Sequence, residues 1–212
     1  MRKFAAILCA AVLSLGVVST VFANPSISEV TIEAQETKVD TETAKIIPEG
    51  KILVVKEAAP ENYESKEAAE VVTKLNDPKK VITTKEILET LKVDTTKEIK
   101  TESGNVIKPE EYEPITKFAD IVITDGSTKV EYDFDGEVKA VKTTVAVEAL
   151  KDLEKEDIKN IILMQIDPKT GEVYFIEINE EDFDPETGEI TVTFPCLGPF
   201  TVMEKPAENT AE

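Results

Sequence analysis

Hydrophobic and polar positions follow their clearest pattern near the C-terminal end of the chain. Residues 190–194 alternate between large apolar side chains and threonines, which is typical of an antiparallel strand with one solvated face. Residues 161–166 are apolar at all but one position and therefore on both faces, so we expect this strand to lie nearer the middle of the sheet. Further β-branched or aromatic runs occupy residues 173–178 and 200–203. The four runs predict an antiparallel meander or sandwich.

One turn sequence, Asp-Pro-x-Thr-Gly-Glu, occurs twice among these runs, at residues 167–172 and 184–189. Its aspartate can accept hydrogen bonds from backbone N–H groups just ahead, and its proline fixes φ at the first corner. Its glycine takes the positive φ from which the next strand begins. Each copy therefore predicts a tight reversal between two strands.

A helical pattern precedes the strands, in the first half of the chain. Residues 65–76 place one stripe of apolar side chains along a helix: Ala68, Val71, Val72 and Leu75. A second, short helix is expected after Thr83, because Thr83 and Glu86 have the spacing of a capping box. This helical pair is a candidate for a separate subdomain.

These patterns together predict an α+β chain with two folded parts. We expect a small α+β region of helices and strands over residues 46–114, followed by a mainly antiparallel β-sandwich over residues 115–203. Within the sandwich, the alternation over 130–134 and 138–147 predicts two more strands, and residues 150–158 favour a short helix or a helical turn.

Two polar segments flank the folded parts. Residues 24–45 are rich in Thr, Glu and Ser, and residues 204–212 are similarly polar. Apolar residues are scattered singly in both, so neither segment buries enough surface to offset the entropy lost on ordering. We predict a disordered tether before the folded parts and a disordered tail after them.

The N-terminal residues 1–23 have the features of a secretory signal peptide. Arg2 and Lys3 precede an apolar run over residues 4–18, and a small-residue exit ends at Ala23. The apolar run is shorter than the roughly 20 residues that a membrane-spanning helix needs. We therefore expect cleavage after Ala23, no membrane span in the mature chain, and a secreted, extracellular or cell-envelope location.

The chain is strongly acidic, which narrows the classes of partner. It has 43 acidic and 24 basic residues and a formal net charge of −19. Loss of residues 1–23 would remove Arg2 and Lys3 but no acid, so the mature chain would carry −21. A field of this sign repels nucleic acid and anionic lipid, so no nucleic-acid partner is expected.

The residues available for chemistry do not indicate an enzyme or a bound cofactor. The chain has no histidine, so it lacks the usual base of Ser-His and Cys-His nucleophile pairs. The chain has so many carboxylates that their presence does not distinguish an enzyme from a non-enzyme. A hydrolase that uses two facing acids is therefore kept as an alternative. Cys196 is the only cysteine after residue 23; its apolar neighbours favour a small buried filler over a reactive thiol or an intermolecular bridge.

Calcium is the ligand that the acidic residues suggest most specifically. Glu131, Asp133, Asp135 and Gly136 have the spacing of positions one, three, five and six of an EF-hand loop. The twelfth position is a lysine and the flanks read as strands, so an acidic strand that runs into an Asp-Gly hairpin explains the same residues. A second acidic group lies on the loop between the repeated hairpins, and a solvated loop explains it equally well. The candidate calcium ligands are Asp133, Asp135, Asp182 and Asp184.

The C-terminal pattern also resembles a known type of module. It consists of an apolar strand, an Asp-Pro-x-Thr-Gly-Glu hairpin, an aromatic strand, a second Thr-Gly turn and a closing Thr-Phe-x-x-Leu-Gly-Pro-Phe segment at residues 193–200. In this order, residues 118–203 resemble the terminal β-sandwich module of secreted bacterial proteins of unknown function. The resemblance implies a fold and a compartment, and it carries over no catalytic or binding residue.

Three functional hypotheses follow from the sequence. We expect a secreted or envelope-associated, non-catalytic interaction or structural protein, whose partner is an extracellular protein or an envelope component that binds strand edges or loops. The first alternative is an extracellular domain that binds calcium or is stabilised by it. The second is a carboxylate-dependent hydrolase, which requires a cleft with two facing acids.

Overall fold

The computed structural model describes residues 31–95, 98–101, 103–127 and 129–206. The predicted signal peptide and residues 207–212 of the predicted tail lie outside these ranges. The predicted fold class is confirmed: the chain is α+β, with antiparallel strand pairs throughout its sheets and few helices.

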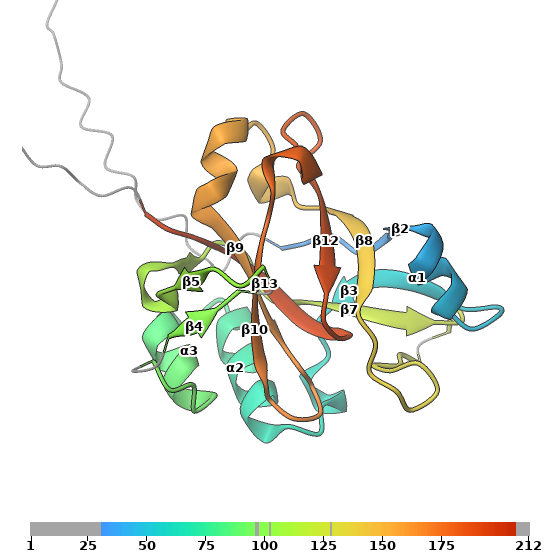
Figure 1. The fold of residues 1–212 in the computed structure, drawn as a ribbon. Coiled ribbons are helices and arrows are strands. Elements are labelled where there is room, and N and C mark those ends of the chain that lie inside the picture. Colours follow the sequence, from blue (N-terminus) through green and yellow to red (C-terminus); the bar gives the residue numbers. More distant parts are fainter. Residues whose placement is uncertain (1–30, 96–97, 102, 128, 207–212) are drawn as a thin grey trace, which may run out of the picture.

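Most strands belong to two antiparallel sheets (Figure 1). The larger sheet has, in spatial order, β1 Gln35–Glu36, β3 Ile52–Glu57, β7 Ala119–Thr124, β13 Gly198–Glu204, β9 Ile161–Ile166 and β10 Val173–Glu177, and β6 Glu113–Pro114 pairs with the end of β13. The smaller sheet has, in order, β11 Phe183–Asp184, β12 Glu189–Phe194, β8 Val141–Ala146 and β2 Lys38–Val39. A separate hairpin is formed by β4 Ile99–Lys100 and β5 Val106–Ile107.

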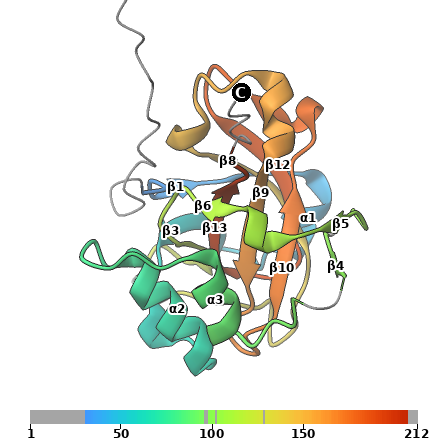
Figure 2. The same cartoon turned by 90° about the vertical axis from the view of Figure 1, so that its left-hand side faces the viewer.

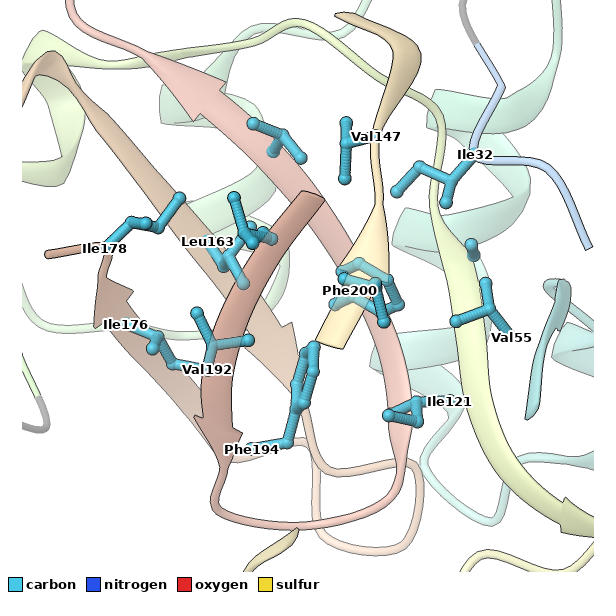
Figure 3. Close-up of a cluster of buried hydrophobic side chains, with 14 of the residues drawn as sticks. Ile32, Val55, Ile121, Val147, Leu163, Ile176, Ile178, Val192, Phe194 and Phe200 are labelled. Carbon is cyan, nitrogen blue, oxygen red and sulfur yellow. The ribbon is translucent and has the colours of Figure 1, made fainter. Parts of the chain in front are cut away.

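The inner faces of the two sheets enclose the main hydrophobic core (Figure 3). Val192 and Phe194 of β12 point toward Leu163 of β9 and Phe200 of β13. The rings of Phe194 and Phe200 meet edge to face, with centroids 5.0 Å apart. The predicted sandwich is therefore present, with the alternating apolar residues of 190–194 on its inner side.

A second hydrophobic cluster lies on the outer face of the larger sheet. The helices α2 Lys66–Asn76 and α3 Thr84–Thr90 cover this face (Figure 2). Strand β9 is thus buried on both faces, in agreement with its apolar sequence, because Leu163 belongs to the sandwich core and Met164 to the helix-covered cluster.

The helices match the sequence pattern closely. The stripe predicted for α2 is buried in full: Ala68, Val71, Val72 and Leu75. The Ser65 hydroxyl caps α2 by accepting from the Ala68 N–H at 3.2 Å. Thr83 and Glu86 form the predicted capping box at the start of α3.

The predicted boundary between residues 114 and 115 does not divide the structure. Strand β3, from the first predicted part, pairs along its whole length with β7, from the second. The helices pack on this shared sheet and do not form a separate subdomain. The sequence left open whether residues 46–114 form an independent domain, because strand pairing over long sequence separations leaves no local pattern.

The predicted tether is also ordered in the portion that is described, residues 31–45. It contains β1, β2 and α1 Thr41–Ile46, whose N-cap is Asp40. The scattered apolar residues of this segment include Ile32, which is buried in the sandwich core. The segment is ordered because its polar residues bond to sheet edges: the Thr37 N–H and hydroxyl both donate to the Leu53 carbonyl, at 3.2 and 3.1 Å.

Two other expectations need correction. Residues 130–134 form no regular strand but two isolated bridges, Ile123 with Glu131 and Phe134 with Glu137. Of the two alternatives for residues 150–158, a short helix or a helical turn, the structure has helical turns of the 3₁₀ type. The tail begins later than predicted, because β13 includes Glu204 and the Lys205 N–H donates to Asn160. The 3₁₀ segments of the chain are η1 Pro60–Asn62, η2 Pro109–Glu111, η3 Glu148–Leu150, η4 Lys155–Asn160 and η5 Glu180–Asp182.

No helix within the described residues has the length and apolar character needed to cross a membrane.

Candidate functional site

Of the two predicted calcium ligands Asp133 and Asp135, Asp133 already has other partners. The Asp133 carboxylate accepts from the Gly136 N–H at 2.9 Å and forms an ion pair with Lys169. The hydrogen bond from Lys169 lowers the pKa of Asp133, because it stabilises the ionised form. Asp135 is exposed and occupies the turn with φ +54°.

The second predicted pair lies at the other acidic loop. Asp182 accepts from the side-chain amide of Asn179 at 3.0 Å, and Asp184 accepts from the Glu186 N–H at 3.0 Å. Over the part of the chain that is described, no three Asp, Glu or Cys side chains converge as a metal ion would require. The calcium hypothesis stays a prediction without a formed site.

The repeated turn sequence forms two matching turns. Asp167 and Asp184 each accept from the backbone N–H two residues ahead, at 2.7 and 3.0 Å. Their carbonyls accept from Gly171 and Gly188, both at 2.8 Å, and these glycines have φ of +79° and +69°. The first turn joins β9 to β10 and the second joins β11 to β12, so both hairpins were predicted correctly.

Both turns also anchor distant segments through the same atom, the proline carbonyl. The Pro168 carbonyl accepts from the N–H groups of Glu64 and Ser65, both at 2.9 Å, at the start of α2. The Pro185 carbonyl accepts from the Asp152 N–H at 2.8 Å, just after η3. The two turns therefore hold distant segments of the chain in place through backbone hydrogen bonds.

A buried carboxylate on the outer face of the larger sheet was not foreseen from the sequence. Asp120 lies within β7 and is 1% exposed. One carboxylate oxygen accepts from the Tyr63 hydroxyl at 2.5 Å. The other accepts from the Tyr132 hydroxyl at 2.7 Å and from the Ala59 N–H at 3.0 Å. The two tyrosine rings meet edge to face, with centroids 5.7 Å apart.

The surroundings of Asp120 change its acidity and that of its partners. Burial raises the pKa of Asp120 to about 6, although the hydrogen bonds from Tyr63, Tyr132 and Ala59 oppose this effect. Burial, followed by the nearby Asp120 charge, raises the pKa of both tyrosines. The only sequence signal for this site is an acid placed in the middle of an apolar strand.

A second acid, Glu177 of β10, joins the β4–β5 hairpin to the larger sheet. Its carboxylate accepts from the Thr101 hydroxyl and the Asn105 side-chain amide, both at 2.8 Å, and from the Ser103 hydroxyl. Burial by itself would raise the pKa of Glu177, but these hydrogen bonds outweigh it and the pKa is lowered. This acid, too, holds two parts of the fold together.

A surface hollow lies between α2 and α3 and has a volume of about 490 Å³. Val81, in the loop between the helices, is 87% exposed at its edge. Charged residues of both signs surround it: Lys74, Lys80, Glu86 and Glu89. The hollow thus offers an apolar contact within a charged rim.

Cys196 is buried, as its apolar neighbours predicted. Its carbonyl accepts from the side-chain amide of Gln165 at 2.7 Å, which ties the β12–β13 connection to β9. Gln165 is fully buried, and its side-chain oxygen has no hydrogen-bond partner among the described residues.

Comparison with known proteins gives no relative from which a role could be transferred. No family model matches the chain, and no curated protein or solved structure is significantly similar to it.

Proposed function

We propose that the chain is a secreted or cell-envelope-associated interaction or structural module with no catalytic activity of its own. The observation that carries the proposal is the structural role of three of its acids. Asp120, Asp133 and Glu177 each accept from groups on other segments and so hold the fold together. Acids used in this way support a rigid scaffold.

The surface of such a scaffold must then recognise a partner, and the hollow between α2 and α3 is the contact that we propose. An exposed apolar side chain next to a concave surface is a common anchor for a protein contact. Val81 has this position, and its loop is held at both ends: the Asp77 carboxylate accepts from the Lys79 N–H at 3.0 Å after α2, and Thr83 caps the start of α3. The proposed partner is an extracellular protein or an envelope component.

The proposal can be tested by sedimentation with isolated cell envelopes of the source organism. The mature chain, residues 24–212, should sediment with the envelopes, and Val81→Asp should reduce the bound fraction at least tenfold. Val138→Asp is the matched control, because Val138 is also exposed, at 49%, but lies away from the hollow. Equal binding by both variants would show that this hollow is not the contact. No envelope binding by the unmodified chain would contradict the envelope-associated form of the proposal.

The proposed location has an independent test. The protein should be recovered from the medium or the envelope with Asn24 as its first residue, which N-terminal sequencing detects. Recovery from the cytoplasm with Met1 retained would contradict secretion.

A further inference from the structure

Asp120 joins three segments that are far apart in the sequence. Its strand, β7, lies within the larger sheet. The segment over residues 59–63, which contains η1, reaches it through the Ala59 N–H and the Tyr63 hydroxyl. The loop between β7 and β8 reaches it through the Tyr132 hydroxyl. The carboxylate is therefore the polar link that both covering segments share.

We propose that Asp120 is a pH-sensitive latch, whose ionisation favours opening of the two segments that cover it. The covering contacts on Asp120 are two neutral hydroxyls and one backbone amide, and no Lys or Arg forms a salt bridge with it in the described residues. When the segments lift, water replaces the protein around the carboxylate and solvates the charge better than these neutral donors do.

The charged groups around Asp120 further disfavour its ionisation in the closed state. Glu61 of η1 is the acid on the covering segment, and its charge raises the pKa of Asp120 further. On β3, Lys56 is the register partner of Asp120, but its ammonium group lies 3.5 Å from the Ser127 carbonyl. On β13 the register partner is Pro199, which has no charge. The nearest groups thus include an acid that disfavours ionisation in the closed state.

Thermodynamic linkage gives the direction and size of the effect. In the closed state the Asp120 carboxyl titrates near pH 6, and in the open state it should return to its ordinary value of 3.8. Between these values the closed state holds a proton that the open state has lost. The opening equilibrium constant should therefore rise by about tenfold per pH unit, or about a hundredfold in total, and stay constant above pH 6. Acid conditions close the latch.

The Ala59 amide is a direct reporter, because its N–H donates to the Asp120 carboxylate. Its hydrogen-exchange protection factor, corrected for the intrinsic exchange rate at each pH, should fall about a hundredfold from pH 4 to pH 7. Low concentrations of urea should leave this factor almost unchanged, because a local opening exposes little surface. A protection factor independent of pH would overturn the proposal, as would one that falls with urea in parallel with global unfolding.

Two variants assign the effect to Asp120. In Asp120→Asn, the pH dependence at Ala59 should disappear, and its persistence would overturn the assignment. In Tyr132→Phe the acid is kept but one donor to its ionised form is lost, so the transition should move to higher pH. An unchanged midpoint in Tyr132→Phe would overturn the latch, so the test does not depend on whether the Asn variant folds.

Discussion

Gln35 forms two hydrogen bonds to the backbone of Ala146 through its side-chain amide, so that a side chain takes the place of a neighbouring strand. Its amide nitrogen donates to the Ala146 carbonyl at 2.9 Å, and its oxygen accepts from the Ala146 N–H at 2.8 Å. The backbone of Gln35 meanwhile pairs with Val55 in the other sheet. One residue therefore connects both sheets along the edge of the sandwich.

Removal of this connection should destabilise the fold measurably. Gln35→Ala leaves the N–H and carbonyl of Ala146 without these partners, and we expect a loss of about 1–3 kcal/mol in the free energy of unfolding. Glu36→Ala is the matched control, since Glu36 is the exposed neighbour, and it should change stability by less than about 0.5 kcal/mol. Urea denaturation measures both, and equal effects would refute the role of Gln35.

The second of the repeated turns should be sensitive to a single methyl group. Gly188 has φ +69°, and a Cβ atom there would lie 2.5 Å from the Val147 carbonyl oxygen. Gly126 has φ +88° with nothing within 4 Å of such an atom, so its alanine variant isolates the backbone strain. We expect a loss of about 1–2 kcal/mol for Gly126→Ala, and about 1–3 kcal/mol more for Gly188→Ala. Equal melting temperatures of the two variants would show that the contact is relieved without cost.

These turns show what can be predicted from one sequence. Asp167, Gly171 and their counterparts act through neighbours within a few residues, so the turn could be predicted from the local sequence alone. The helix caps and the two-sided burial of β9 have the same local origin. The predicted tether failed for the opposite reason, because Gln35 is ordered by bonds to residue 146, far away in the chain.

The candidate site was harder to predict than the fold. Asp120 could be noted as an acid within an apolar strand, but its two tyrosine partners come from loops on either side of β7 in the sequence. Nothing in the spacing of Tyr63 and Tyr132 indicates that they meet. Asp133 was selected for its spacing to other acids, yet its partner is Lys169, which belongs to a turn interpreted only as a hairpin.

The raised pKa of Asp120 predicts a specific pH dependence of stability. The folded-state pKa of about 6 lies above the ordinary value of 3.8, so the native state binds a proton that the unfolded state has released. The resulting stability is fully present below pH 3.8 and is lost as the pH rises through 6. Relative to Asp120→Asn, the wild type should lose about 3 kcal/mol between pH 4 and pH 7. A constant difference between their unfolding free energies would contradict the assignment.

The ion pair between Lys169 and Asp133 provides the test of the calcium hypothesis. Because the Lys169 ammonium already neutralises this carboxylate, we expect the same melting temperature in millimolar calcium and in excess chelator. If the chain had a calcium site, calcium at a hundred times the dissociation constant would add about 2.7 kcal/mol to the free energy of unfolding. This would raise the melting temperature by several degrees. Such a shift, if lost in Asp133→Asn or Asp184→Asn, would establish a calcium site and overturn this expectation.

The variant Lys169→Met removes the ion pair with Asp133, so it measures the contribution of this pair to stability independently of any metal. Both side chains are partly exposed, at 33% for Lys169 and 22% for Asp133, so the loss of stability at neutral pH should not exceed about 1 kcal/mol. The lowered pKa of Asp133 means that its contribution is present above pH 3.8 and is lost as the pH falls. The difference between wild type and Lys169→Met should therefore shrink on acidification, in the opposite direction to the effect of Asp120→Asn. Unfolding free energies measured at pH 3 and pH 7 distinguish the two acids, because only a carboxylate stabilised in its ionised form gives this sign.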